Sequence, residues 1–356
     1  MPISNPTPHP RPRLAIAIDT EEAFNWDEPF SREHTCVSHM RYVPLLQDLF
    51  LGFGAKPTYL IDYPVAAQAD GYGPLREFVQ DGKADVGAHL HPWNTPPLAE
   101  DVNAFNSYAG NLPPDLERAK LQCLRDTIED AFGRPPRVYR AGRYGLGPSS
   151  LATLGSLGFE VDTSPTPAFD LTGDGGPDYS DFPTAPFWAD KRGGVLCVPY
   201  SGAFVGPLPR PVGAAIHRAV MRLPGSGLSI ALLSLLKIVY RARLSPEGFT
   251  LGEMQGLTRQ LLAAGNEIFV LSFHSPTIEP GNTPYAKTLA ERDAFLGKIR
   301  DYIAFFVGEC GGELTTLTEY RAELIARETL GTRLVCGVSD SRVKASWDMQ
   351  RSCVAP

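Results

Sequence analysis

The chain lacks the features that define several common classes of protein. Its six cysteines form no C-x-x-C motif and no closely spaced pair, so we expect neither a disulfide framework nor a zinc ribbon. No apolar run reaches the roughly 20 residues needed to span a bilayer. Lys and Arg form no block and the net charge is -7, which argues against binding to nucleic acid.

The two ends of the chain carry little sign of a packed core. The first residues, "MPISNPTPHPRPR", have no apolar segment typical of a signal peptide, so we expect a disordered leader over residues 1–12. We therefore expect a cytoplasmic protein with reduced thiols, or one associated with a membrane surface. Near the other end, "RAELIARETL" indicates a helix, and residues 326–356 are expected to form a C-terminal helix and tail.

The rest of the chain is typical of a large folded protein. Hydrophobic residues make up 43% of the sequence and charged residues 21%. Seven short apolar segments have the length and composition of β-strands. They are Leu14–Asp19, Pro57–Asp62, Ala84–His91, Arg137–Ala141, Phe159–Asp162, Val195–Tyr200 and Glu267–His274.

Amphipathic segments of helical length lie between several of these strands, at Tyr42–Phe53, Pro113–Phe132 and Ser149–Leu157. Repeated alternation of strand and helix favours parallel strands joined by right-handed crossovers. The sequence therefore predicts an α/β fold, a closed or nearly closed β/α barrel over residues 13–325. Such a barrel carries its chemistry at the carboxyl ends of its strands.

Ionisable residues occur at six of the seven predicted strand ends. They are Asp19, Asp62, His89 with His91, Arg140, Asp162 and His274. In "DVGAHLHPW", the two histidines are one residue apart, and such residues of an extended segment point to the same face. Both imidazoles can then bind one metal ion. The alternative is that one histidine packs in the core and the other is solvated.

Two carboxylates in "IAIDTEEAF" are predicted to complete this site. Asp19 and Glu21 share one face of an extended segment, and Thr20 and Glu22 share the other. One of the two same-facing carboxylates can bind the cation, and the other can act as a general base toward water whose pKa the cation lowers. A solvated acidic turn is the alternative interpretation.

The order of these motifs resembles the NodB-type polysaccharide deacetylases, carbohydrate esterase family 4. The resemblance runs from about Leu14 to Tyr320 and rests on the acid cluster, H-x-H-P, R-x-x-R-Y-G, a strand-end Asp and L-x-x-H. It implies a distorted β/α barrel of seven or eight strands. The gap in the histidine motif is two residues shorter than in the family's usual H-x-x-x-H-P. In this respect the chain resembles a divergent branch, the deacetylases found with bacterial surface-glycan genes.

The resemblance implies an N-deacetylase that attacks the acetamide of an amino sugar or glycan with metal-activated water. Asp19 would be the base, His274 the general acid, and His89 and His91 metal ligands. The family usually has two adjacent aspartates where this chain has Asp-Thr-Glu-Glu, so the third ligand follows from the alternation argument. That argument selects Glu21 as the carboxylate ligand, and Glu22 is the alternative.

Further roles follow from the resemblance. Arg140 would keep the base ionised, and Asp162 would orient the acid His274. The backbone N–H of Tyr144 would stabilise the oxyanion, and Leu271 would line the acetyl-methyl pocket.

Three other residues are candidates for contact with the sugar. Arg143 is an added cation suited to an anionic sugar, and the rings of Trp93 and Tyr144 are candidates for stacking on the substrate.

The resemblance further implies one divalent cation, with zinc as the default, although Fe, Co, Ni or Mn also suit two histidines and a carboxylate. Three alternatives remain open. The first is a relative that opens a cyclic amide, as an allantoinase or imidase does. The second is an inactive barrel that only binds glycan. The third is a non-haem iron oxygenase, which uses the same ligand types.

A helical insertion is predicted at about residues 205–262. It contains "LSIALLSLLKIVY" (Leu228–Tyr240), thirteen residues that are apolar nearly all round a helix. We predict a buried helix or a lid. An interfacial helix that meets a lipid-linked glycan, or a dimer contact, is the alternative.

Overall fold

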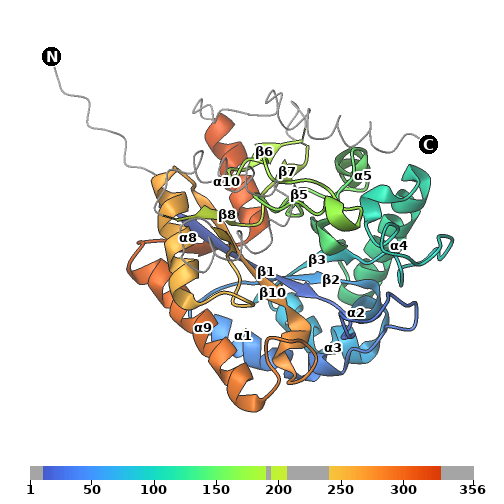
Figure 1. Ribbon diagram of the computed structural model, residues 1–356, viewed down its shortest axis with the longest axis horizontal. Coiled ribbons are helices and arrows are strands. Elements are labelled where there is room, and N and C mark those ends of the chain that lie inside the picture. Colours follow the sequence, from blue (N-terminus) through green and yellow to red (C-terminus); the bar gives the residue numbers. More distant parts are fainter. Residues whose placement is uncertain (1–10, 190–193, 207–239, 330–356) are drawn as a thin grey trace, which may run out of the picture.

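The computed structural model describes residues 11–189, 194–206 and 240–329. A nine-stranded, mainly parallel sheet curls into half a barrel (Figure 1). The strand order is β10-β1-β2-β3-β4-β5-β7-β6, and β11 pairs with β1. The strands are β1 (Arg13–Thr20), β2 (Thr58–Ile61), β3 (Asp85–Leu90), β4 (Val138–Ala141), β5 (Val161–Asp162), β6 (Phe187–Trp188), β7 (Leu196–Cys197), β10 (Ile268–His274) and β11 (Glu313–Thr315).

The predicted α/β barrel class is confirmed, and each of the seven predicted strands is present. Within the described residues the sheet is open, because its order starts at β10 and ends at β6, which runs antiparallel to β7. Sequence reasoning missed β6, β11 and a separate hairpin. These segments are two to four residues long, too short to show a periodic pattern.

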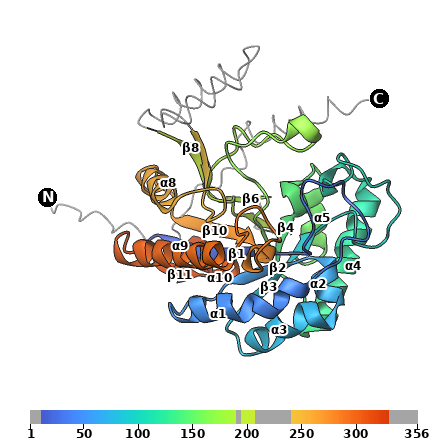
Figure 2. The same ribbon diagram turned by 60° about the horizontal axis from the view of Figure 1, so that its bottom comes forward.

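Helices pack around the sheet, and Figure 2 shows α1 to α3 beside β2 and β3, with α9 beside β10. Three of them, α1, α4 and α5, match the predicted helices. The helices are α1 (Val43–Leu51), α2 (Tyr63–Ala67), α3 (Ala69–Gln80), α4 (Pro114–Phe132), α5 (Ser150–Ser156), α8 (Leu251–Ala263), α9 (Leu289–Gly308) and α10 (Leu317–Thr329). Short 3-10 helices are η1 (Ser38–Tyr42), η2 (Ala109–Asn111), η3 (Gly142–Tyr144), η4 (Thr172–Asp174) and η5 (Ser275–Ile278).

Strand β1 is an inner strand of the sheet, flanked by the edge strand β10 and by β2. Its residues from Leu14 to Thr20 are all buried, which accounts for the nearly continuous apolar run in the sequence. On the C-terminal side, α8 and α9 both begin with capping boxes, formed by Thr250 with Glu253 and by Thr288 with Glu291. These caps define where the helices that flank β10 start.

Strands β8 (Gly202–Val205) and β9 (Tyr240–Arg243) form an antiparallel hairpin that stands off the main sheet (Figure 2). β8 lies at the start of the predicted insertion of about residues 205–262, and β9 and nearly all of α8 lie inside that range. The segment Leu228–Tyr240 lies outside the described residues except for Tyr240, which begins β9. The predicted C-terminal helix is present as α10, whereas the leader before residue 11 and the tail after residue 329 lie outside the described residues.

In the described part of the chain, no helix combines the length and apolar character that crossing a membrane requires.

A buried carboxyl group makes the stability of the fold depend on pH. Glu117 of α4 is 1% exposed and accepts a hydrogen bond from Ser150 at the start of α5. Burial raises the pKa of Glu117 to about 7. The folded state therefore binds this proton more tightly than the unfolded state, so stability is lost as the pH rises from the unfolded pKa through about 7.

We expect Glu117→Gln to remove this loss, because the amide keeps an acceptor for Ser150 and cannot ionise. The variant should gain stability relative to wild type between pH 5 and pH 8, by roughly 3 kcal/mol at most. Urea unfolding at the two pH values measures this gain. Glu129→Gln on the exposed side of α4 is the control, and equal pH profiles for wild type and Glu117→Gln would contradict the prediction.

Candidate functional site

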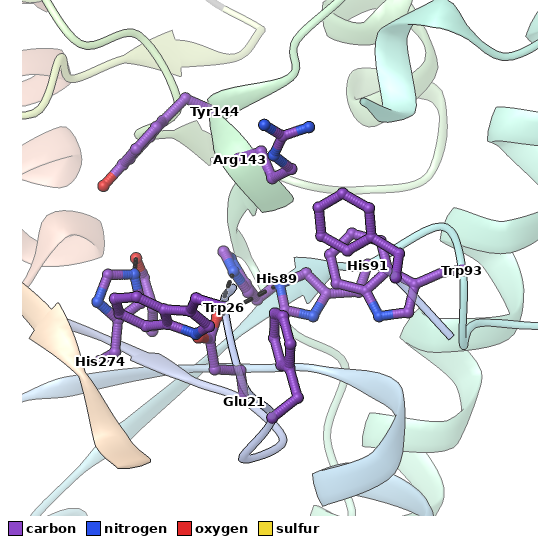
Figure 3. Close-up of a pocket in the computed structure, with 11 residues that line it drawn as sticks. Glu21, Trp26, His89, His91, Trp93, Arg143, Tyr144 and His274 are labelled. Atoms are coloured by element: carbon purple, nitrogen blue, oxygen red, sulfur yellow. Dashed lines mark ion pairs between the residues drawn. The ribbon is translucent and has the colours of Figure 1, made fainter. Parts of the chain in front are cut away.

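The register of the parallel strands brings the predicted site residues together. Asp19 on β1 lies opposite His274 on β10, and His89 on β3 lies opposite Arg140 on β4. A cavity of about 160 Å³ opens where these strands end (Figure 3). Its lining comprises Asp19, Glu21, Phe24, Trp26, Phe30, His89, His91, Trp93, Arg143, Tyr144 and His274.

Three buried side chains form a group that could hold a metal ion. Glu21 Oε2 lies 3.2 Å from His89 Nε2 and 3.3 Å from His91 Nε2. The three ligand atoms lie within 4.8 Å of one another, and all three residues are buried. Glu21, which alternation along the sequence selected, thus lies beside both histidines, although β1 itself ends at Thr20.

The hydrogen bonds behind the two histidines fit a cation in front of them. His89 Nδ1 lies 3.2 Å from the carbonyl oxygen of Arg140, which can only accept, so this nitrogen carries the proton. His89 Nε2 then presents a lone pair to the carboxylate of Glu21. His91 Nδ1 is likewise held, 2.8 Å from Glu22 Oε2. A positive ion between these lone pairs and the carboxylate of Glu21 would stabilise the arrangement. Histidines that bind metal ions usually have their other ring nitrogen held by a hydrogen bond in this way.

Glu22 supports His91 from behind and does not face the Nε2 atoms. Its carboxylate also accepts hydrogen bonds from Trp93 Nε1 at 3.0 Å and Asn94 Nδ2 at 2.7 Å. Its backbone N–H donates to Asp62 Oδ2 at 2.8 Å. Glu22, Asp62 and His91 form a second buried group of possible ligands, which shares His91 with the first. The two adjacent glutamates thus have different surroundings.

Glu22 and Asp62 hold at least one proton between them near neutral pH. Burial, together with the neighbouring charge of Glu21, raises the pKa of Glu22 to about 8. Burial and the charge of Glu22 raise the pKa of Asp62 well above its usual value. For Glu21, burial alone would raise the pKa, but the charge of His274 lowers it below its usual value. Glu21 is therefore the ionised carboxylate of the group.

Asp19 is held by a fully buried arginine. Arg140 NH1 donates to Asp19 Oδ1 at 2.6 Å and also to Ser272 Oγ. Its Nε donates to the carbonyl oxygen of Thr163 at 3.1 Å. The second carboxylate oxygen, Asp19 Oδ2, lies 3.8 Å from His274 Nε2. Asp19 thus lies between an arginine and a histidine at the edge of the cavity.

The partner of His274 is Glu247, and the predicted pairing with Asp162 is wrong. His274 Nδ1 donates to Glu247 Oε2 at 2.7 Å, and the backbone N–H of His274 donates to Glu247 Oε1 at 3.1 Å. Burial would lower the pKa of His274, but the carboxylates of Glu247, Glu21 and Asp19 raise it well above its usual value. Sequence reasoning missed Glu247 because it lies in a loop, "SPEGF", with no periodic pattern.

Asp162 and His274 have different partners, and β1, β2, β3 and β4 lie between β5 and β10 in the strand order. The carboxylate of Asp162 accepts hydrogen bonds from Ser164 Oγ at 2.5 Å and from Cys197 Sγ at 3.7 Å. Burial raises the pKa of Asp162 to about 7. It is a buried acid that supports the loop after β5.

Two predicted substrate contacts are not available in this geometry. Leu271 is fully buried in the core and is absent from the cavity lining, because on β10 it points away from the side that carries His274. Trp93 reaches the cavity but is only 2% exposed. Its ring stacks on His91 with centroids 4.2 Å apart, so that face is closed to a sugar.

Arg143 and Tyr144 do line the cavity, on the side opposite Glu21 (Figure 3). Arg143 is ion-paired with Asp174 and donates to Ser107 Oγ at 2.6 Å, so its charge already has a partner. Both Arg143 and Tyr144 have left-handed backbone angles, φ 53° and φ 60°. Such angles cost non-glycine residues on the order of 1–3 kcal/mol each and occur where surrounding structure enforces them.

The aromatic residues best placed for a ligand come from the loop after β1. Phe24, Trp26 and Phe30 line the cavity and are partly exposed. The Trp26 ring lies edge-on to His274, with centroids 4.9 Å apart. The sequence "AFNWDEPF", directly after the acid cluster, carried this signal, but no periodicity assigned its direction.

No known family model and no curated protein matches the chain. Among solved structures, a candidate polysaccharide deacetylase from Mycobacterium smegmatis is similar to it, with a TM-score of 0.50, 16% identity, and coverage of 92% of this chain and 94% of that one. The allantoinase Puue gives 0.48, 15%, 91% and 95%, and a peptidoglycan N-acetylglucosamine deacetylase gives 0.42, 10%, 88% and 89%. The first similarity shows that the fold is the distorted barrel of polysaccharide deacetylases.

The close packing of Gly142 against His91 yields a test of whether the group of Glu21, His89 and His91 holds a metal ion. A Cβ added at Gly142 would lie 2.5 Å from His91 Cδ2 and 2.5 Å from the carbonyl oxygen of Leu90. We expect Gly142→Ala to displace the His91 ring and to weaken zinc binding about 10- to 100-fold, the range seen when support of a ligand is lost. Competition with a chromophoric chelator measures the affinity.

Gly73→Ala, where a Cβ meets nothing within 4 Å, is the control. Unchanged zinc affinity in a folded Gly142→Ala protein would show that His91 is not a ligand.

Proposed function

We propose that this protein is a metal-dependent N-deacetylase that acts on an N-acetylated amino sugar or glycan. The ligands would be Glu21, His89 and His91, and zinc is the preferred cation because two histidines and one carboxylate with an open position are a common catalytic zinc site. The observation that carries the proposal is the convergence of this group with Asp19 and His274 in one cavity.

The bound cation would supply Lewis acidity toward the acetamide oxygen and toward water. Asp19 is placed to accept the proton of the attacking water, at the edge of the cavity, and it forms a buried, charge-assisted pair with Arg140. In the balanced reaction the water oxygen bonds to the acetyl carbon and the C–N bond breaks. The products are acetate and an amine.

His274 is placed to donate a proton to the leaving nitrogen. Glu247 occupies Nδ1, which leaves Nε2 facing the cavity near Asp19. The raised pKa of His274 favours the protonated form that an acid requires. An amine is a poor leaving group unless protonated, so this step matters for an amide more than for an ester.

The walls of the cavity support a sugar as the substrate. Phe24, Trp26 and Phe30 present partly exposed rings beside the ligand group, and Tyr144 lies across from them. Aromatic rings of this kind offer flat apolar surface to the faces of a sugar ring. The small volume of the whole cavity, about 160 Å³, suits an acetyl group better than a long acyl chain.

His91→Ala and Asp19→Asn should fail in different ways. We expect His91→Ala to lose both bound zinc and activity, because two remaining ligands bind weakly. Asp19→Asn should keep zinc and lose amine release by a factor on the order of 10²–10⁴, the usual contribution of general acid-base catalysis.

Zinc content beside the rate of amine release from N-acetylglucosamine oligomers measures both effects. Full zinc retention in His91→Ala would contradict the ligand assignment. Turnover of allantoin but not of acetylated sugars would indicate a cyclic-amide hydrolase instead of a sugar deacetylase. If zinc-loaded protein turns over neither substrate, the proposed activity is wrong.

Glu247→Gln tests the support of His274. The amide can still accept from Nδ1, but it no longer stabilises the protonated ring, so we expect a lower kcat with normal zinc content. The pH at which activity is lost on the alkaline side should fall, because the pKa of His274 falls. Asp162→Asn is the matched control, since Asp162 was the partner expected from the sequence. An alkaline limit that shifts with Asp162→Asn and not with Glu247→Gln would contradict this assignment.

A further inference from the structure

Two arginines of the β8–β9 hairpin have no role in the chemistry described above. Arg241 and Arg243 are two residues apart on β9, so they point to the same face of the strand, while Ala242 between them is fully buried. The hairpin stands off the main sheet (Figure 2). Both arginines are partly buried.

Their contacts place them next to the cavity. Arg243 Cζ lies 4.8 Å from the centroid of the Tyr144 ring, and Tyr144 lines the cavity. The same atom lies 3.7 Å from the Phe169 centroid, and Arg241 Cζ lies 5.1 Å from it. The two guanidinium groups therefore share one aromatic ring, and one of them adjoins the wall of the cavity.

Neither guanidinium has an acidic partner among residues 11–189, 194–206 and 240–329, where no carboxylate lies within 4.0 Å of either. Arg243 Nε is moreover buried without a hydrogen-bond partner. Burial and the like charge of Arg243 lower the pKa of Arg241, and Asp170 opposes this only from a distance, with its Oδ1 accepting hydrogen bonds from Thr172. Buried donors are rarely left unpaired.

Arg143 differs from Arg241 and Arg243 because it has an acidic partner. The sequence suggested Arg143 for an anionic sugar, but Asp174 neutralises it. Arg241 and Arg243 have no such carboxylate partner in the described part of the chain, and the rings of Tyr144 and Phe169 flank Arg243. Neither arginine lines the cavity, so a group that they bind would lie next to it.

We propose that Arg241 and Arg243 form a subsite for an oxyanion carried by the substrate, a carboxylate or a phosphate group. The planar donor array of a guanidinium matches both groups in a bidentate geometry. The inference deepens the proposed function, because it makes the substrate an acidic glycan rather than a neutral one. Its binding step can nevertheless be measured without turnover.

Calorimetric titration of the zinc-loaded, full-length protein with glucuronate and with inorganic phosphate tests the subsite directly. We expect Arg243→Gln to weaken binding of the preferred anion about 10- to 100-fold, as the loss of a hydrogen bond to a charged group does. Arg259→Gln is the matched control. Its Cζ also lies 4.8 Å from an aromatic centroid, that of Phe305, but it is paired with Glu309.

The His91→Ala protein separates this subsite from the metal site, because anions also bind metal ions. Retained binding in His91→Ala, lost on adding Arg243→Gln, supports the subsite. Preference for glucuronate indicates a uronic acid in the substrate, and preference for phosphate indicates a phosphorylated glycan. Absence of binding of either anion to the wild-type protein, or an equal loss in Arg259→Gln, overturns the proposal.

Kinetics distinguish an anion subsite from simple support of Tyr144. With acidic and neutral N-acetylated oligosaccharides, Arg243→Gln should raise KM for the acidic substrate and leave kcat and the neutral substrate unchanged. Arg243→Lys should recover part of the loss, because it keeps the charge. An equal fall in kcat for both substrates would show that Arg243 only positions Tyr144 and would overturn the proposal. If neither substrate is turned over, the proposed deacetylase activity fails, and the titrations alone decide the subsite.

Discussion

The site depends on one buried ion pair, Arg140 with Asp19. Arg140 is fully buried, and a charge in that position is tolerated only when it is paired and its donors are satisfied. From β4 it reaches Asp19 on β1, Ser272 on β10 and the loop after β5. It therefore ties strands on both sides of β1 into one arrangement. The carbonyl oxygen of the same residue fixes the ring of His89, so one residue orients both the carboxylate and a histidine of the ligand group.

Much of this centre could be predicted from the sequence, because parallel strands carry their chemistry at one edge of a sheet. Alternation along an extended chain was enough to place Asp19, Glu21, His89 and His91 on the same side. The same reasoning failed for Asp162. Its strand end does face the same edge, but strand order decides which ends are neighbours, and order across a sheet is not visible in one sequence. The predicted role of Leu271 in the pocket is wrong for a different reason. Leu271 lies three residues before His274 on β10, so alternation along the strand turns its side chain away from the cavity.

Loops account for the rest of what the sequence concealed. Glu247 reaches His274 from a segment without periodicity, and the rings of Phe24 and Trp26 enter the cavity from the irregular chain after β1. Trp93 shows the reverse case. Its position after His91 suggested a sugar platform, but its N–H is used by Glu22 and its ring is turned inward. The second glutamate of Asp-Thr-Glu-Glu thus orders the far side of His91 while the first faces the cavity.

The pairing of β1 with β10, a strand from late in the chain, has a consequence for biosynthesis. Glu21, His89 and His91 are all made within the first 91 of 356 residues, whereas β10, which pairs with the other edge of β1, comes at residues 268–274. Until then β1 presents an unpaired edge, a form prone to wrong pairing. The three residues that could hold a metal ion are therefore made well before the strand that carries His274 and protects this edge of β1.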